Sequence, residues 1–166
     1  MIIDKISTKK EDIVLTGITL LSEEEYLEYK DKITAVNKHW WLRSPGRTDI
    51  LAAYVFGEDG FVDVNGDYAG FAFGVRPALC IGDLKSLQVG DKFELAKYSW
   101  TIISDKYALC DYVIGHSAFQ KGKPNIGRFN DYETSDVKQY VESWAKENGI
   151  EFDKELDDNL EDDLEG

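Results

Sequence analysis

One stretch of the sequence carries acidic and amide side chains at the spacing of a calcium-binding loop. Residues 63–67 read DVNGD, so oxygen-bearing side chains occupy every second position, as they do in the EF-hand loop. The pattern then fails, because Tyr68 stands where that loop needs glycine and Gly74 where it needs glutamate. The dipeptide Asn65-Gly66 is instead typical of a type I′ turn, so we expect a β-hairpin here and no metal.

The cysteines and histidines give little support to catalysis or metal binding. Cys80 and Cys110 each lie in an apolar, strand-like run, so we expect both to be buried free thiols. His39 and His116 are too few, and too poorly supported by neighbouring groups, for a catalytic triad or a zinc site. We therefore predict a protein that is not an enzyme and that has no cofactor and no metal.

Residues 115–131 form a loop-like segment rich in glycine and lysine, with a faint likeness to a phosphate-binding loop. Six residues rather than four separate its first two glycines, and a proline follows Lys123 where serine or threonine is required. Phosphate binding is rejected for that reason. Lys121, Lys123 and Arg128 lie near two phenylalanines, and they form either a small basic-aromatic contact patch or a solvated loop.

The charge of the chain is negative and unevenly distributed. The formal net charge is −13, and residues 151–166 hold nine acids and one lysine, so −8 lies in that tail and −5 in the rest. Direct binding to nucleic acid is disfavoured by this balance. An acidic segment can instead bind a basic surface that would otherwise hold nucleic acid, and the alternative is a solvated, partly disordered tail.

Composition fits one ordinary domain with a tail. Of the 166 residues, 43% are apolar, which is enough for a core, and we expect one domain over residues 1–150 followed by the acidic tail at 151–166. No stretch approaches the roughly 18 uncharged residues of a membrane helix, and residues 1–12 lack the apolar region of a signal peptide. We expect no membrane association and a cytoplasmic location.

Local patterns predict an α+β domain with mostly antiparallel short strands and two helices. Ser22 and Glu25 form a capping box that begins a helix over 22–30, and a second helix is expected over 134–148 before Gly149. The patterns favour strands at 13–21, 51–56, 61–64 and 107–114, and a hairpin over 93–104 that turns at Ala96-Lys97.

Several motifs resemble a domain of unknown function that is common in gut-bacterial and phage proteins. They are WWLRSPG at 40–46 and GVRPAL at 74–79, with AxxVxxxDGxV at 52–62 between them and LLSEEEY at 20–26 before them. VGDKFELAKYSWTII at 89–103 and YETSDVKQYV at 132–141 are similar to elements that come first in that family. The chain thus looks circularly permuted, with halves 14–82 and 89–150.

The resemblance implies a C-type-lectin-like fold, shared with formylglycine-generating enzymes and with variable receptor-binding proteins of phages. It implies that a strand within 93–103 pairs with residues 75–81 and closes one body. It gives no activity, because the family has no assigned chemistry and a fold does not fix a function. The reactive cysteine pair of the formylglycine-generating enzymes is not carried over to Cys80 and Cys110, since both are expected within strands.

Three tryptophans and two arginines are interpreted first as structural residues. Trp40, Trp41 and Trp100 are expected to anchor the core, although exposed tryptophans also serve as contact sites. Arg76 is expected to lock loops through a carboxylate or an aromatic ring. For Arg43 both a structural role and ligand binding remain open.

We expect a non-catalytic binding module whose ligand is another protein and whose contacts come from loops 43–49, 67–71 and 115–130. The candidate contact residues are Arg43, Arg47, Asp49, Asp67, Tyr68, Phe71, Lys121, Lys123 and Arg128. The alternative is an acidic phage-type inhibitor, such as an anti-CRISPR or other anti-defence protein, that blocks a basic nucleic-acid-binding surface.

Overall fold

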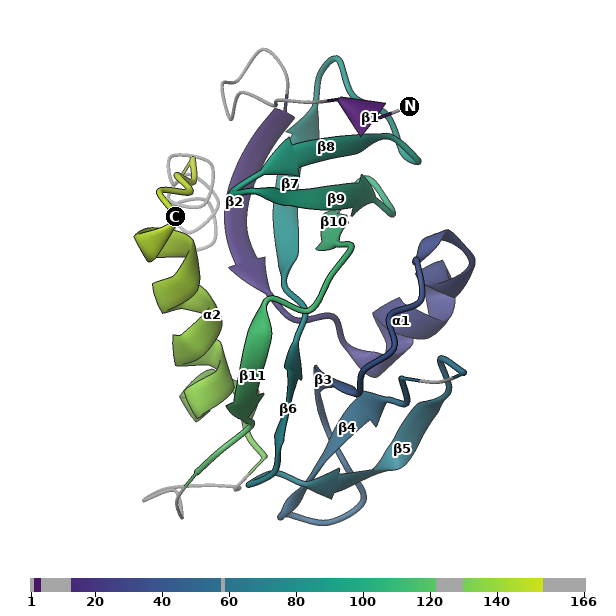
Figure 1. Cartoon of the computed structure of the whole chain (residues 1–166), viewed down its shortest axis with the longest axis vertical. Coiled ribbons are helices and arrows are strands. Elements are labelled where there is room, and N and C mark those ends of the chain that lie inside the picture. The colour runs from purple at the N-terminus through teal and green to yellow at the C-terminus, as the bar shows by residue number, and fades with distance from the viewer. Residues whose placement is uncertain (1, 4–12, 58, 122–129, 154–166) are drawn as a thin grey trace, which may run out of the picture.

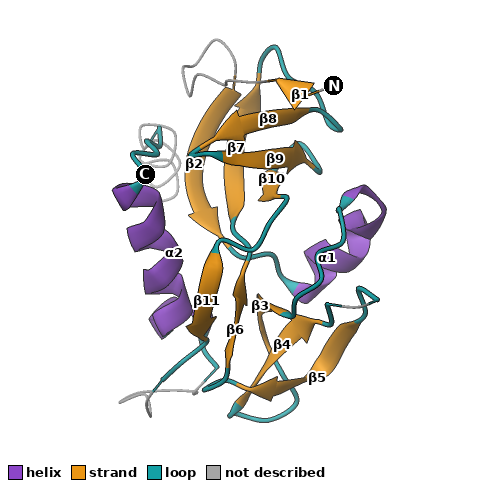
Figure 2. Ribbon diagram, in the orientation of Figure 1, coloured by secondary structure: helices purple, strands orange, loops and turns teal. Residues whose placement is uncertain are grey.

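The computed structural model describes residues 2–3, 13–57, 59–121 and 130–153. It is an α+β fold of mostly antiparallel sheets with two α-helices, as the sequence predicted (Figures 1 and 2). Within these residues, no helix combines the length and the apolar character that crossing a bilayer requires.

One sheet forms the upper part of the molecule in Figure 1 and has the strand order β1-β8-β9-β10-β7-β2. Its strands are β1 (Ile2–Ile3), β2 (Ile13–Thr19), β7 (Ala78–Leu84), β8 (Lys92–Leu95), β9 (Tyr98–Ile102) and β10 (Tyr107–Cys110). Its pairs are antiparallel except for β1 with β8.

The second sheet lies below the first and has the order β11-β6-β3-β4-β5. Its strands are β3 (Trp40–Pro45), β4 (Leu51–Val55), β5 (Val62–Tyr68), β6 (Ala72–Val75) and β11 (Gly115–Ala118). The helix α2 (Asp136–Glu147) runs beside both sheets and contacts β2 and β11. The helix α1 (Glu23–Tyr29) contacts β3 and β5, and 3-10 turns occupy Lys30–Lys32 and Tyr132–Thr134.

Two extended segments pass from one sheet into the other and hold the sheets together. The segment β6–β7 crosses at Arg76 and Pro77, and the segment β10–β11 crosses at residues 111–114. They run antiparallel, with the Cys110 N–H donating to Pro77 O at 2.9 Å and the Ile114 N–H to Val75 O at 2.9 Å. The predicted pairing of 93–103 with 75–81 is therefore wrong, because β10 pairs with β7 and β9 lies one strand further out.

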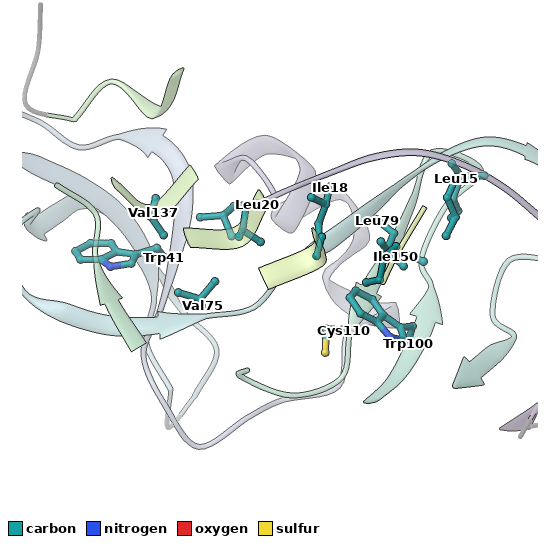
Figure 3. Packing of buried hydrophobic residues seen from close by; sticks show 14 of the residues in the cluster. Leu15, Ile18, Leu20, Trp41, Val75, Leu79, Trp100, Cys110, Val137 and Ile150 are labelled. Atoms are coloured by element: carbon teal, nitrogen blue, oxygen red, sulfur yellow. The ribbon is translucent and has the colours of Figure 1, made fainter. Parts of the chain in front are cut away.

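The larger hydrophobic core cluster draws on both sheets and on α2. Figure 3 shows Trp41, Val75 and Val137 at one end of this cluster and Trp100, Leu79 and Ile150 at the other. A second cluster under α1 joins Leu21, Tyr26, Trp40, Leu42 and Val55 among others. Burial of these aromatic and aliphatic side chains is the main driving force for closing the two sheets on one another.

The helix ends follow the local signals in the sequence. Ser22 Oγ accepts from the Glu25 N–H, and Glu25 Oε1 accepts from the Ser22 N–H, which completes the predicted capping box. Ser135 caps α2 by accepting from the Lys138 N–H. Gly149 follows α2 with φ of +70°, the left-handed conformation expected at a helix C-terminus.

The predicted hairpin turn at Asn65-Gly66 is wrong. These residues form a bulge inside β5, where Ala53 of β4 faces residues 64–66, and Asp63 Oδ1 accepts from the Asn65 and Gly66 N–H groups. Gly66 has φ of +86°, and a Cβ there would lie 2.5 Å from Ala52 O, so the bulge requires glycine. The preference of the asparagine-glycine pair for positive φ is thus used in a bulge instead of a turn.

Two predicted boundaries also differ from the structure. Residues 115–118, expected in a loop, form β11, because they continue the extended path of β10 beside β6. At the other end, Phe152 packs against the larger core cluster and the Asp153 N–H donates to Leu15 O at 2.7 Å. The packed body thus extends to at least residue 153, and the rest of the predicted acidic tail lies outside the described residues.

The predicted turn at Ala96-Lys97 is confirmed and gives a test. Both residues have positive φ, 54° and 69°, between the paired strands β8 and β9. A non-glycine residue at such φ costs about 1 kcal/mol. We expect Lys97→Gly to raise the free energy of unfolding by about 0.5–1 kcal/mol, less whatever the glycine adds to the entropy of the unfolded chain. Urea denaturation measures it.

Lys106→Gly, in the turn between β9 and β10, is the matched control because Lys106 has no positive φ. It should lower the free energy of unfolding. Equal effects of the two glycine substitutions would contradict the role of backbone strain at Lys97.

Candidate functional site

The described parts of the three predicted contact loops meet at the lower end of the molecule (Figure 1). The Ala69 N–H donates to Ile50 O at 2.9 Å, which joins the loop after β3 to the loop after β5. The Gln120 N–H donates to Ala69 O at 3.0 Å, which adds the segment after β11. The composition of these segments predicted that they form contact loops. Backbone hydrogen bonds, which the composition does not predict, bring them together.

Three large apolar side chains are exposed here, Ile50 and Phe71 in loops and Tyr68 at the end of β5, because the predicted loop at 67–71 begins inside that strand. Ile50, Tyr68 and Phe71 are 51%, 40% and 49% exposed, around the fully buried Ala69. The rings of Tyr68 and Phe71 lie 5.4 Å apart at 85°, an edge-to-face contact that orients both. We call these three residues the apolar centre of the loop end.

Charged side chains surround the apolar centre. Arg47, Asp49 and Lys121 are exposed, and Asp67 is half-buried with its Oδ1 accepting from the Tyr68 N–H at 2.7 Å. An apolar centre within a charged rim is the usual anatomy of a protein contact surface. Lys123 and Arg128, the other two predicted basic contacts, lie outside the described residues.

Asn130 is a structural residue of the loop end that the sequence analysis did not single out. It is buried, and its Nδ2 donates to Thr48 O at 2.9 Å and to Leu51 O at 2.7 Å. Its Oδ1 is buried and has no hydrogen-bond partner among the described residues. Both donors of the amide therefore serve to hold the loop between β3 and β4, which keeps Ile50 in place.

Arg43, predicted either as a contact or as a structural residue, is engaged within the protein. Its guanidinium donates from Nη1 to Glu25 Oε1 at 2.6 Å and from Nη2 to Glu25 Oε2 at 3.1 Å, and Nη1 also reaches Leu20 O. It ties β3 to the capping box of α1, beside a cavity of about 580 Å³ that Asn130 also lines. This geometry favours the structural role.

The remaining predicted structural residues are all buried. Trp40, Trp41 and Trp100 lie in the core, and the indole Nε1 of Trp41 donates to Ser117 O at 2.8 Å. Arg76 is 1% exposed, with its guanidinium 4.9 Å from the Trp40 ring centroid. The motifs WWLRSP and GVRPAL thus meet through this stacking contact.

The two cysteines and the two histidines lie on different elements of the fold. Cys80 and Cys110 form no disulfide, and burial raises the pKa of Cys110 to about 12, whereas Cys80, predicted to be buried, is only half-buried. His39 Nδ1 accepts from the Gly57 N–H, and His116 lies exposed on β11. Across the ranges the structure describes, no three histidine, cysteine, aspartate or glutamate side chains are grouped to hold a metal.

Sequence reasoning missed one polar cluster entirely. The buried carboxylate of Asp111 accepts from Thr101 Oγ1 at 2.6 Å, from Ser99 Oγ at 2.7 Å and from Lys92 Nζ at 2.9 Å. Its members come from β8, from β9 and from the residue after β10, so only the strand pairing brings them together.

Comparison of the chain with models of protein families, with the curated proteins and with the solved structures found no match. The likeness to the C-type-lectin-like fold therefore stays a prediction.

The contact between Arg43 and Glu25 predicts a pH-dependent stability. Burial opposes ionisation of Glu25, but the hydrogen bonds from Arg43 and the Ser22 N–H outweigh it and lower the pKa of Glu25 below 4.5. The ionised Glu25 side chain therefore stabilises the folded protein above the ordinary pKa of glutamate, and this stabilisation is lost as pH falls through the lowered pKa. Glu25→Gln should reduce the free energy of unfolding by about 1 kcal/mol at pH 7, and by much less near pH 3.

Urea denaturation of both proteins at the two pH values measures this difference. Glu24→Gln, one position earlier and exposed, is the matched control and should have little effect at either pH. A Glu25→Gln effect of the same size at both pH values would rule out the ionised contact as its cause.

Proposed function

We propose that this protein is a non-catalytic binding module that contacts another protein through its loop end. The observation that carries the proposal is the exposure of Ile50, Tyr68 and Phe71 at one end of the molecule, where the loops are hydrogen-bonded to one another. Large apolar side chains grouped on a surface are costly to leave in water, and such groups mark interaction sites.

The backbone of the loop end supports a preformed contact surface. The Arg47 N–H donates to Asn65 O at 2.8 Å, the Phe71 N–H to Tyr68 O at 3.0 Å, and Asn130 holds the loop between β3 and β4. Loops fixed in this way lose little conformational entropy when a partner binds, so more of the contact energy appears as affinity.

The chemistry of the apolar centre favours a protein ligand. Tyrosine is among the residues that dominate binding energy at protein interfaces, and here it packs edge-to-face against a phenylalanine. The rim offers charges of both signs, Arg47 and Lys121 against Asp49 and Asp67, which can set orientation and specificity.

A capture experiment tests the proposal. The full chain is immobilised and exposed to an extract of the organism that makes it, beside a variant that carries Ile50→Ser, Tyr68→Ser and Phe71→Ser. We expect at least one protein to be retained by the native chain and lost from the variant, with retention persisting at about 0.5 M salt because the central contact is apolar.

The matched control carries Leu27→Ser and Val89→Ser, two exposed apolar residues away from the loop end. It should retain the same protein, and thermal unfolding should show that both variants remain folded. Retention by the native chain that the triple variant preserves would refute the loop end as the contact surface.

The net charge of −13 supports a second candidate, an acidic inhibitor of a basic nucleic-acid-binding surface. The same experiment separates the two. A captured basic protein that is released between about 0.1 and 0.5 M salt, and that the triple variant retains, would favour charge-based inhibition over the loop end.

A further inference from the structure

A groove on a different part of the molecule has its own chemistry and does not depend on the proposed function. It has a volume of about 710 Å³ and lies between the segment 34–38, which follows α1, and the residues 111–113, which follow β10. Lys92 and Ser99 of the upper sheet complete it. We call it the Lys92 groove. None of its lining residues belongs to the loop end.

The polar end of the Lys92 groove is fixed by the Asp111 cluster. Both carboxylate oxygens of Asp111 already accept hydrogen bonds, Oδ1 from Thr101 and Oδ2 from Lys92 and Ser99. Asp111 is buried and its carboxylate is hydrogen-bonded to these neighbours, so it is not available to bind a ligand.

Lys92 retains binding capacity toward the groove. Its ammonium group has three N–H donors, of which one is directed to Thr101 Oγ1 at 2.6 Å and one to Asp111 Oδ2 at 2.9 Å. Its side chain is 32% exposed and lines the groove, and the ammonium has one donor beyond the two that these bonds use. A long side chain held at two points keeps its charged end in a defined position.

The lining of the groove carries a net positive charge, whereas the protein as a whole is negatively charged. Its lining carries two lysines, Lys38 and Lys92, against one acid, Asp111. The buried guanidinium of Arg76 lies behind this wall, where Nη2 donates to Thr34 O at 2.7 Å and Nε to Cys110 O at 2.7 Å. In a chain of net charge −13, this local excess of positive charge favours an anion.

The walls of the groove are mostly apolar, although Thr34 and Asn37 also line them. Ala35 and Val36 line one side, and Val113 and Tyr112, which is 57% exposed, line the other. Small-molecule sites combine such walls with a few placed polar groups that fix orientation. A ligand that fits both features has an apolar body and one negatively charged group.

We propose that the Lys92 groove binds a small organic anion whose aromatic or branched aliphatic body lies between Val36 and Tyr112. The anionic group, a carboxylate or a sulfonate, accepts hydrogen bonds from Lys92 and Lys38. Binding needs no covalent step and no cofactor.

The probe is 1-anilinonaphthalene-8-sulfonate, whose fluorescence rises in an apolar site, and the neutral N-phenyl-1-naphthylamine is its matched control. We expect the full chain to bind the sulfonate at least about fivefold more tightly than the neutral dye. Lys38→Glu should weaken sulfonate binding about five- to tenfold and leave binding of the neutral dye unchanged. Lys106→Glu, an exposed lysine outside the groove, should change neither.

Location is checked by amide chemical shifts in a heteronuclear NMR spectrum. The sulfonate should shift the signals of residues 34–38 and 111–113. Equal binding of the two dyes, equal effects of Lys38→Glu and Lys106→Glu, or loss of the sulfonate signal in the Ile50, Tyr68 and Phe71 triple variant would each overturn the proposal. The last result would place the dye on the loop end and leave the proposed function standing.

Discussion

The buried guanidinium of Arg76 is the interaction on which the arrangement of the two sheets depends. It lies where the segment β6–β7 leaves one sheet for the other, and it reaches across to Cys110 O on the neighbouring crossing segment and to Thr34 O on the chain after α1. Its stacking on Trp40 adds the strand β3. Burial lowers the pKa of Arg76 to about 10, so the group remains charged at neutral pH and has to be satisfied by the carbonyl oxygens and the ring around it.

Two separate surfaces follow from this crossing. The extended segments run antiparallel through both sheets, so the loops at the far end of β6 and β11 emerge together and create the loop end. On the near side, the same crossing turns residues 111–113 toward the segment 34–38 and leaves the Lys92 groove between them. The loop end has an apolar centre within a rim of both charges, and the Lys92 groove is concave with a positively charged lining. The same fold thus carries two surfaces that differ in shape and charge.

The sequence predicted the features that are decided locally and missed those that are decided by pairing. The capping box at Ser22, the helix end at Gly149 and the turn at Ala96-Lys97 each depend on a few neighbouring residues, and each was found. No local pattern encodes which strands pair with one another. The bulge at Gly66, the strand β11 and the pairing of β7 with β10 depend on such pairing. For the same reason Tyr68 and Phe71 were found as exposed residues, although Tyr68 ends β5 instead of lying in a loop, whereas Lys92 and Asp111, 19 positions apart, were not found.

The bulge in β5 also bears on how the protein behaves at high concentration. β5 is an outer strand with Val64 exposed and Phe61 exposed just before it, the kind of sheet border on which further chains add and aggregates grow. At residues 64–66 the ladder is interrupted, and Asp63 occupies two backbone donors of its own strand. A second chain therefore finds no continuous row of backbone groups to pair with, and the sheet stops growing at this border.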